Sequence, residues 1–129
     1  MILLNNLYTI VARDFSDNKI KFDIKLDANH FIYQAHFPNE PITPGVCIIQ
    51  IAKELLEDYL AKQMKIHLVK NVKFLSIISP ITTPLVSCVF DKITAEDNGN
   101  AYRVQVHIQS NETPLAKISF LCKCHDGKQ

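Results

Sequence analysis

Hydrophobic and polar residues alternate along several segments of the chain. In KIKFDIKLD, residues 19–27, the apolar side chains fall on one face and the charged ones on the other. AYRVQVHIQ, residues 101–109, alternates in the same way. A period of two indicates half-buried strands. Residues 7–13 are apolar and rich in β-branched side chains, and the turn-forming Ser16–Asn18 separates them from 19–27, which predicts a hairpin.

One segment has the length and composition of a long helix. It begins at Gly45, ends near Lys62 and would span about 27 Å. Its first two turns are apolar on nearly every side, which predicts burial along its N-terminal half. Polar side chains gather later, where we expect the helix to emerge into solvent: Lys53, Glu54, Glu57, Asp58 and Lys62.

The remaining segments predict a sheet that wraps around this helix. Residues 69–75, 85–94 and 115–123 are strand-like and, with 101–109, are joined mostly by short turns. Short connections favour an antiparallel meander. A single sheet buries one apolar helix by curling around it. The sequence therefore predicts an α+β fold, an antiparallel sheet wrapped around one long central helix, as a single domain over residues 1–129.

Composition narrows the function classes. The net charge of +1 argues against nucleic-acid binding, which favours a basic face. The chain has no apolar run of about 18 residues, so we expect no membrane span. The start, MILLNNLYTI, has no basic segment or cleavage site of a secretory signal, so we expect a cytoplasmic protein.

The cysteines are expected to be reduced and buried. Cys47, Cys88, Cys122 and Cys124 sit in apolar segments and behave there as small hydrophobic residues. The Cys-x-Cys spacing of the last two, even with His125, lacks the two-residue gap and second pair of a zinc site. We expect no metal site and no cofactor.

The stretch AHFPNEPITPGVCIIQIAKELL, residues 35–56, carries the candidate chemistry. His36 precedes three prolines and Gly45, and Gln50 is the polar residue inside the apolar start of the helix. This stretch resembles the motif of β-hydroxyacyl-acyl-carrier-protein dehydratases of the hot-dog fold. A second, looser likeness lies in VKFLSIISPITTP, and the order of elements agrees over residues 7–123.

The resemblance implies a hot-dog dimer with acyl tunnels at the subunit interface. It implies that His36 is the catalytic histidine and that Gln50 stands where the family has a catalytic Glu or Asp, in a site shared between subunits. The backbone amides of Gly45 and Val46 would bind the thioester carbonyl. The implied partner is acyl carrier protein bearing a phosphopantetheine-linked acyl chain, or acyl-CoA, and the assembly a homodimer or larger.

The sequence departs from the family pattern at three places. Asn39 replaces a glycine, which is mild because Asn tolerates positive φ. Residues 75–77 are Leu-Ser-Ile where basic residues and proline are common in the family. Gln50 replaces the acid, which is the serious departure.

Removing water from a 3-hydroxyacyl thioester requires a base, an acid and a site for the developing oxyanion. His36 suits the base because its ordinary pKa lies near neutrality, and the positive start of the helix suits the oxyanion. Gln50 has no proton to give, although it can hydrogen-bond a hydroxyl or a water. A general acid contributes about 10²–10⁴-fold. Glu54 lies one turn farther along, about 5.4 Å away, and is not expected to replace the acid.

Two other functions stay open. A thioesterase of the same fold would use Gln50 to position a hydrolytic water. A non-catalytic acyl-binding subunit would pair with an active homologue. A plain structural role is also open for both side chains, His36 as a hydrogen-bonded core residue and Gln50 as a buried amide.

Overall fold

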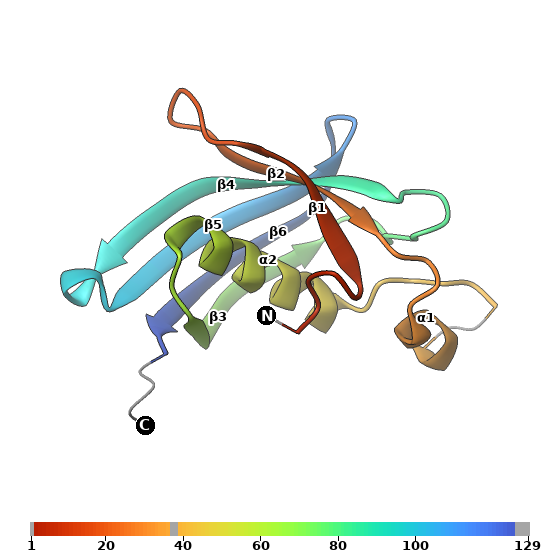
Figure 1. Cartoon of the computed structure of the whole chain (residues 1–129), viewed down its shortest axis with the longest axis horizontal. Coiled ribbons are helices and arrows are strands. Elements are labelled where there is room, and N and C mark those ends of the chain that lie inside the picture. Colours follow the sequence, from red (N-terminus) through yellow and green to blue (C-terminus); the bar gives the residue numbers. More distant parts are fainter. Residues whose placement is uncertain (1, 37–38, 126–129) are drawn as a thin grey trace.

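The computed structural model describes residues 2–36 and 39–125 and shows a curved sheet wrapped over one long helix (Figure 1). The helix α2 spans Gly45–Leu60, the short helix α1 spans Phe31–His36, and a 3-10 turn η1 spans Asp97–Gly99. The sheet is antiparallel, in the order β1-β2-β4-β5-β6-β3. Its strands are β1 Tyr8–Asp14, β2 Ile20–Leu26, β3 Met64–Phe74, β4 Leu85–Glu96, β5 Ala101–Ser110 and β6 Thr113–Cys124.

The alternating segments form strands as predicted. In β2, Phe22 and Ile24 face the helix and are buried, while Lys25 is exposed. In β5, Val104 and Val106 are buried, while the alternating Arg103 and Gln105 are exposed. The predicted hairpin of β1 and β2 is confirmed, with Tyr8 opposite Leu26. The wrapped sheet is the hot-dog arrangement that the resemblance implies.

The meander prediction is wrong for β3. Strands β4, β5 and β6 do pair in sequence, but β3 pairs with β6 and β4 pairs with β2. The link from Leu75 to Pro84 therefore carries the chain from one side of the sheet to the other. Edge strand β3 runs along α2, with its first residue, Met64, at Glu57 and its last residue, Phe74, at Gly45 (Figure 1).

The predicted burial of the long helix is also wrong. The N-terminal turn is the open part, because Val46 is 73% exposed and Cys47 and Ile49 are half-buried. The C-terminal half carries the deepest residues, among them Leu55 and Leu56. Two acidic residues expected in solvent, Glu54 and Glu57, are 0% and 6% exposed. The polarity of these side chains did not predict their burial, because both carboxylates have hydrogen-bond partners inside the fold.

Helix boundaries differ in two places from the sequence prediction. Helix α2 ends at Leu60, because Ala61 adopts the left-handed conformation (φ 54°) as its C-cap. Helix α1, which the sequence did not predict, begins where the His30 ring accepts a hydrogen bond from the backbone of Ile32 at 3.1 Å. His36 therefore ends a helix and does not lie in a loop. In the described parts of the chain, every helix is too short or too polar to cross a bilayer.

Candidate active site

Helix α1 brings His36 to the loop that enters α2. His36 is its last residue; the His36 side chain, like Phe37 and Pro38, lies outside what the structure describes. The helix is tied to the loop by a hydrogen bond of 2.9 Å between the hydroxyls of Tyr33 and Thr43. Both side chains are buried, at 1% and 4% exposure. This pair fixes the backbone on either side of the histidine.

The loop also fixes the first turn of α2. The amide of Thr43 donates to the carbonyl of Ile78 at 2.8 Å, and Pro44 caps the helix in an extended conformation. The carbonyl of Pro44 accepts from the amides of Cys47 and Ile48. Among the described residues no acceptor meets the amides of Gly45 and Val46, as expected for the first amides of a helix. These are the amides predicted to bind a thioester carbonyl, and that role stays a prediction.

Space beside Gly45 is filled by an aromatic ring. A Cβ at this position would lie 2.7 Å from the ring of Phe74, at the end of β3. The sequence interpretation was that Gly45 allows a substrate to approach closely. In this chain it is Phe74, itself 48% exposed, that takes the space a side chain would occupy. A substrate reaching Gly45 from this side would have to displace the ring.

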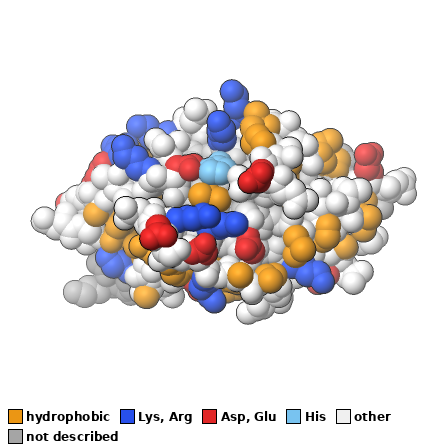
Figure 2. Space-filling view, turned by 90° about the horizontal axis from the view of Figure 1, so that it is seen from above, with side chains coloured by type: hydrophobic (Ala, Val, Ile, Leu, Met, Phe, Trp, Pro, Cys, Tyr) orange, Lys and Arg blue, Asp and Glu red, His pale blue; other side chains and the backbone are white. Residues whose placement is uncertain are grey.

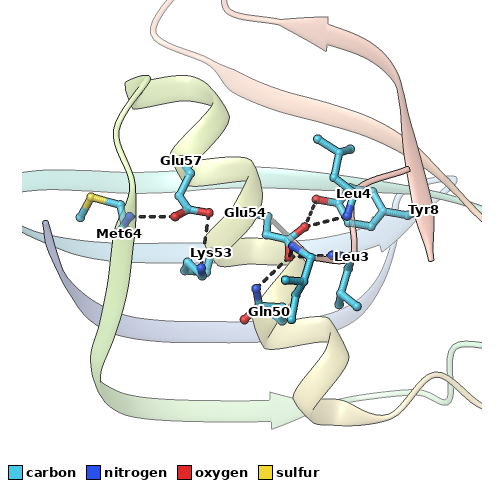
Figure 3. A network of polar contacts seen from close by, with 9 residues as sticks. Leu3, Leu4, Tyr8, Gln50, Lys53, Glu54, Glu57 and Met64 are labelled. Carbon is cyan, nitrogen blue, oxygen red and sulfur yellow. Dashed lines mark hydrogen bonds and ion pairs between the residues drawn. The ribbon is translucent and has the colours of Figure 1, made fainter. Parts of the chain in front are cut away.

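Gln50 belongs to a hydrogen-bonded cluster centred on Glu54 (Figure 3). The amide nitrogen of Gln50 donates to Glu54 Oε2 at 2.8 Å. The same carboxylate accepts from the hydroxyl of Tyr8 at 3.0 Å. It also accepts from three successive backbone amides at 2.9–3.0 Å, those of Ile2, Leu3 and Leu4. With five donors, the acceptor capacity of the carboxylate is filled, so Glu54 does not replace the missing acid.

The environment keeps Glu54 ionised. Burial raises the pKa of its carboxyl, but the hydrogen bonds from Gln50, Leu3, Tyr8 and Ile2 outweigh burial and hold the pKa below its usual range. Burial and the adjacent carboxylate raise the pKa of Tyr8, which stays a neutral donor. Glu54 is thus a buried anion stabilised by neutral dipoles.

A second buried carboxylate ties α2 to the start of β3. Glu57 Oε2 accepts from the amide of Met64 at 2.7 Å, and its Oε1 lies 3.4 Å from the ammonium of Lys53. That oxygen has no hydrogen bond from the described residues, so the contact with Lys53 is ionic. Figure 3 shows Lys53, Glu57 and Met64 on one side of the helix and the Glu54 cluster on the other. The role of Glu57 is to hold the helix to the edge strand.

Other reactive side chains do not join this site. Burial raises the pKa of the Cys47 thiol in the motif, which makes it a poor nucleophile. His107 pairs with Asp91 at 2.7 Å on the outside of the sheet, where both are partly exposed. The face seen from above in Figure 2 mixes acidic and basic side chains. Within residues 2–36 and 39–125, no three potential metal ligands come together.

Sequence reasoning missed three residues that organise the site. Tyr33 and Thr43 gave no signal, because their contact joins α1, which the sequence did not predict, to a residue inside the proline-rich loop. Glu54 did give one: it follows Gln50 by four residues, the spacing at which helical side chains meet. Glu54 is buried because the N-terminal segment packs over it, and no local sequence pattern connects that segment to α2.

Comparisons with known proteins agree on the family and the fold. Residues 12–119 match the family profile described as ApeI-like, ApeI dehydratase. The 3-hydroxyacyl-[acyl-carrier-protein] dehydratase FabZ of Oenococcus oeni is 24% identical over 130 residues, which are 95% of this chain and 89% of that protein. FabZ of Clostridium acetobutylicum is 36% identical over 59 residues, 40% of this chain and 42% of the relative.

Solved structures place the chain in the hot-dog fold, as predicted. The dehydratase heterocomplex ApeI:P of Xenorhabdus doucetiae superimposes with a TM-score of 0.63 at 16% identity, over 88% of this chain and 96% of the other. A protein of Lactococcus lactis named as a candidate thioesterase, yhdA, gives 0.62 at 13% identity, over 98% and 99%. At these identities the likeness concerns the fold.

Proposed function

This chain belongs to the ApeI-like dehydratase family, and from that membership we propose that it removes water from 3-hydroxyacyl groups carried by acyl carrier protein. The observation that carries the proposal is the family match over residues 12–119, which includes the whole stretch from His36 to Gln50. FabZ relatives named for the same reaction support it.

In the proposed mechanism His36 removes the C2 proton of the substrate. The free amides of Gly45 and Val46 and the positive end of α2 stabilise the thioester oxygen as it gains negative charge. The Tyr33–Thr43 hydrogen bond supports this arrangement because it holds α1 against the loop. Without an acid at position 50, the departing hydroxyl takes its proton from His36, at a cost of about 10²–10⁴-fold in rate.

We propose that the site is completed in a dimer. The start of α2 is apolar yet open, since Val46 is 73% exposed, and edge strand β3 exposes Leu68 and Phe74. Apolar surface next to a free strand edge favours a second subunit. The heterocomplex neighbour, ApeI:P, supports pairing of two such chains. In the dimer, His36 of one subunit and Gln50 of the other would face one cavity.

Two alternatives have specific support. The likeness to a candidate thioesterase, together with an amide in place of the acid, fits positioning of a hydrolytic water by Gln50. The heterocomplex neighbour fits a subunit that binds acyl chains and pairs with an active homologue. Both alternatives would act on the same acyl substrate. The products formed from that substrate therefore distinguish them from each other and from the dehydratase.

The decisive experiment incubates the purified protein with 3-hydroxyacyl-acyl carrier protein and with 3-hydroxyacyl-CoA, and measures the products by mass. Loss of one water supports the dehydratase. Loss of the whole acyl chain supports the thioesterase, and an unchanged substrate that co-purifies with the protein supports the binding subunit. Sedimentation analysis of the same sample tests the dimer, and a monomer would contradict the shared site.

A further inference from the structure

The orientation of the Gln50 amide follows from the charge of its neighbour. An ionised carboxylate only accepts hydrogen bonds, so the side chain beside Glu54 must turn its nitrogen, not its oxygen, toward it. The contact of 2.8 Å is short, as expected for a donor meeting an anion. Figure 3 shows the nitrogen toward Glu54 and the oxygen on the side away from it.

Glu54 itself has little freedom to move. Its two oxygens are held by the backbone of Ile2, Leu3 and Leu4 and by Tyr8, and its side chain is fully buried. Gln50 is half-buried, and none of the described residues donates to its Oε1. A rigid anion therefore sets which end of a partly exposed amide is available to a ligand.

We propose that Glu54 is a positioning residue that leaves the Oε1 of Gln50 as the end of the amide that meets a ligand, so that Gln50 acts as a hydrogen-bond acceptor and selects an O–H group of a 3-hydroxyacyl chain or of a water. The identity of that ligand rests on the proposed function, whereas the orientation of the amide does not. Oε1 can hold a hydroxyl in place, but it stabilises no negative charge on a departing oxygen. The replacement of the acid by Gln50 and the burial of Glu54 are therefore linked, because Glu54 orients the amide that stands in place of the acid.

The same arrangement predicts what an acid at position 50 would do. In Gln50→Glu, two carboxyl groups about 3 Å apart would share a proton, because like charges cannot both ionise so close together. Glu54, with its other donors, would draw that proton away from the substrate. Exchanging the two side chains, Gln50→Glu with Glu54→Gln, removes the competing anion and leaves the new carboxyl free to donate outward.

The orientation is tested first by nuclear magnetic resonance of the side-chain amides. In the wild type, one Gln50 amide proton should be shifted downfield and exchange slowly, unlike those of the exposed Gln34. Glu54→Gln should abolish the difference. Glu57→Gln is the matched control, because it removes the other buried carboxylate of α2 and does not touch Gln50. Wild-type signals for Gln50 that match Gln34 would overturn the proposal, even if Glu54→Gln does not fold.

The second test compares dehydration kinetics of Gln50→Glu and the exchange variant. The exchange variant should have a kcat about tenfold or more above the single variant, with a similar KM, since the change concerns proton donation. Equal kcat values in two folded variants would show that Glu54 does not control residue 50. If no form of the protein turns over the substrate, but the wild-type Gln50 amide proton is shifted downfield and exchanges slowly, the proposed function fails and the proposed orientation stands.

Discussion

The Glu54 cluster provides the sharpest prediction about stability. Glu54→Ala removes an acceptor that serves five donors and joins the N-terminal segment to α2. The three backbone amides are only part-buried and can turn to water once the segment detaches. The hydroxyl of Tyr8 cannot, because Tyr8 is 1% exposed and packs in the core.

The size of the effect follows from three terms. An orphaned buried hydroxyl costs about 1–3 kcal/mol. The cavity left by a large buried side chain costs about 2–5 kcal/mol. Removing a buried charge returns several kcal/mol of desolvation. We therefore expect Glu54→Ala to lower the free energy of unfolding by about 3 kcal/mol.

A double-mutant cycle with Tyr8→Phe isolates the hydrogen-bond contribution. In the wild type, Tyr8→Phe removes one donor and should cost about 1 kcal/mol, because Glu54 keeps four others. In the Glu54→Ala background the same change removes the orphaned hydroxyl and should be neutral or stabilising. Urea unfolding at one fixed protein concentration measures all four forms, since association adds to apparent stability. An equal cost of Tyr8→Phe in both backgrounds would refute the reasoning.

Four further predictions concern activity, acid stability and the helix end. His36→Ala should abolish dehydration in a folded protein, and wild-type turnover in a thioester assay would show that another group is the base. Gln50→Glu combined with Glu54→Gln should raise dehydration of a saturated 3-hydroxyacyl substrate about 10²-fold and that of a chain conjugated beyond C3 much less, whereas Gln50→Glu alone should gain less because Glu54 competes for its proton; equal, negligible gains of the exchange variant on both substrates would favour the alternatives. The lowered pKa of Glu54 contributes stability above its ordinary value of 4.5 that is lost as pH falls through the folded pKa, so the difference from Glu54→Gln in acid titrations should shrink below that pH. Ala61→Gly should stabilise by about 1 kcal/mol, because Ala61 holds a left-handed φ of 54°, and a loss of thermal stability would contradict this.

The local pattern determined most of the elements. Side chains alternate with period two in β2 and β5 whatever they pair with, so both strands could be predicted from the sequence alone. The motif from His36 to Gln50 likewise needed no structure, because the order of a histidine, prolines, a glycine and an apolar helix is a local feature. The family match over residues 12–119 agrees with that interpretation.

Tertiary structure decided which polar groups are buried and which strands are neighbours. Glu54 and Glu57 look like surface residues in sequence, but distant donors, the amides of residues 2–4 and of Met64, satisfy their charges inside the fold. Strand β3 pairs with β6 because the sheet closes around α2, a long-range constraint that short connections do not encode. The N-terminal turn of α2 stays open for a similar reason, since a sheet on one side covers the helix unevenly.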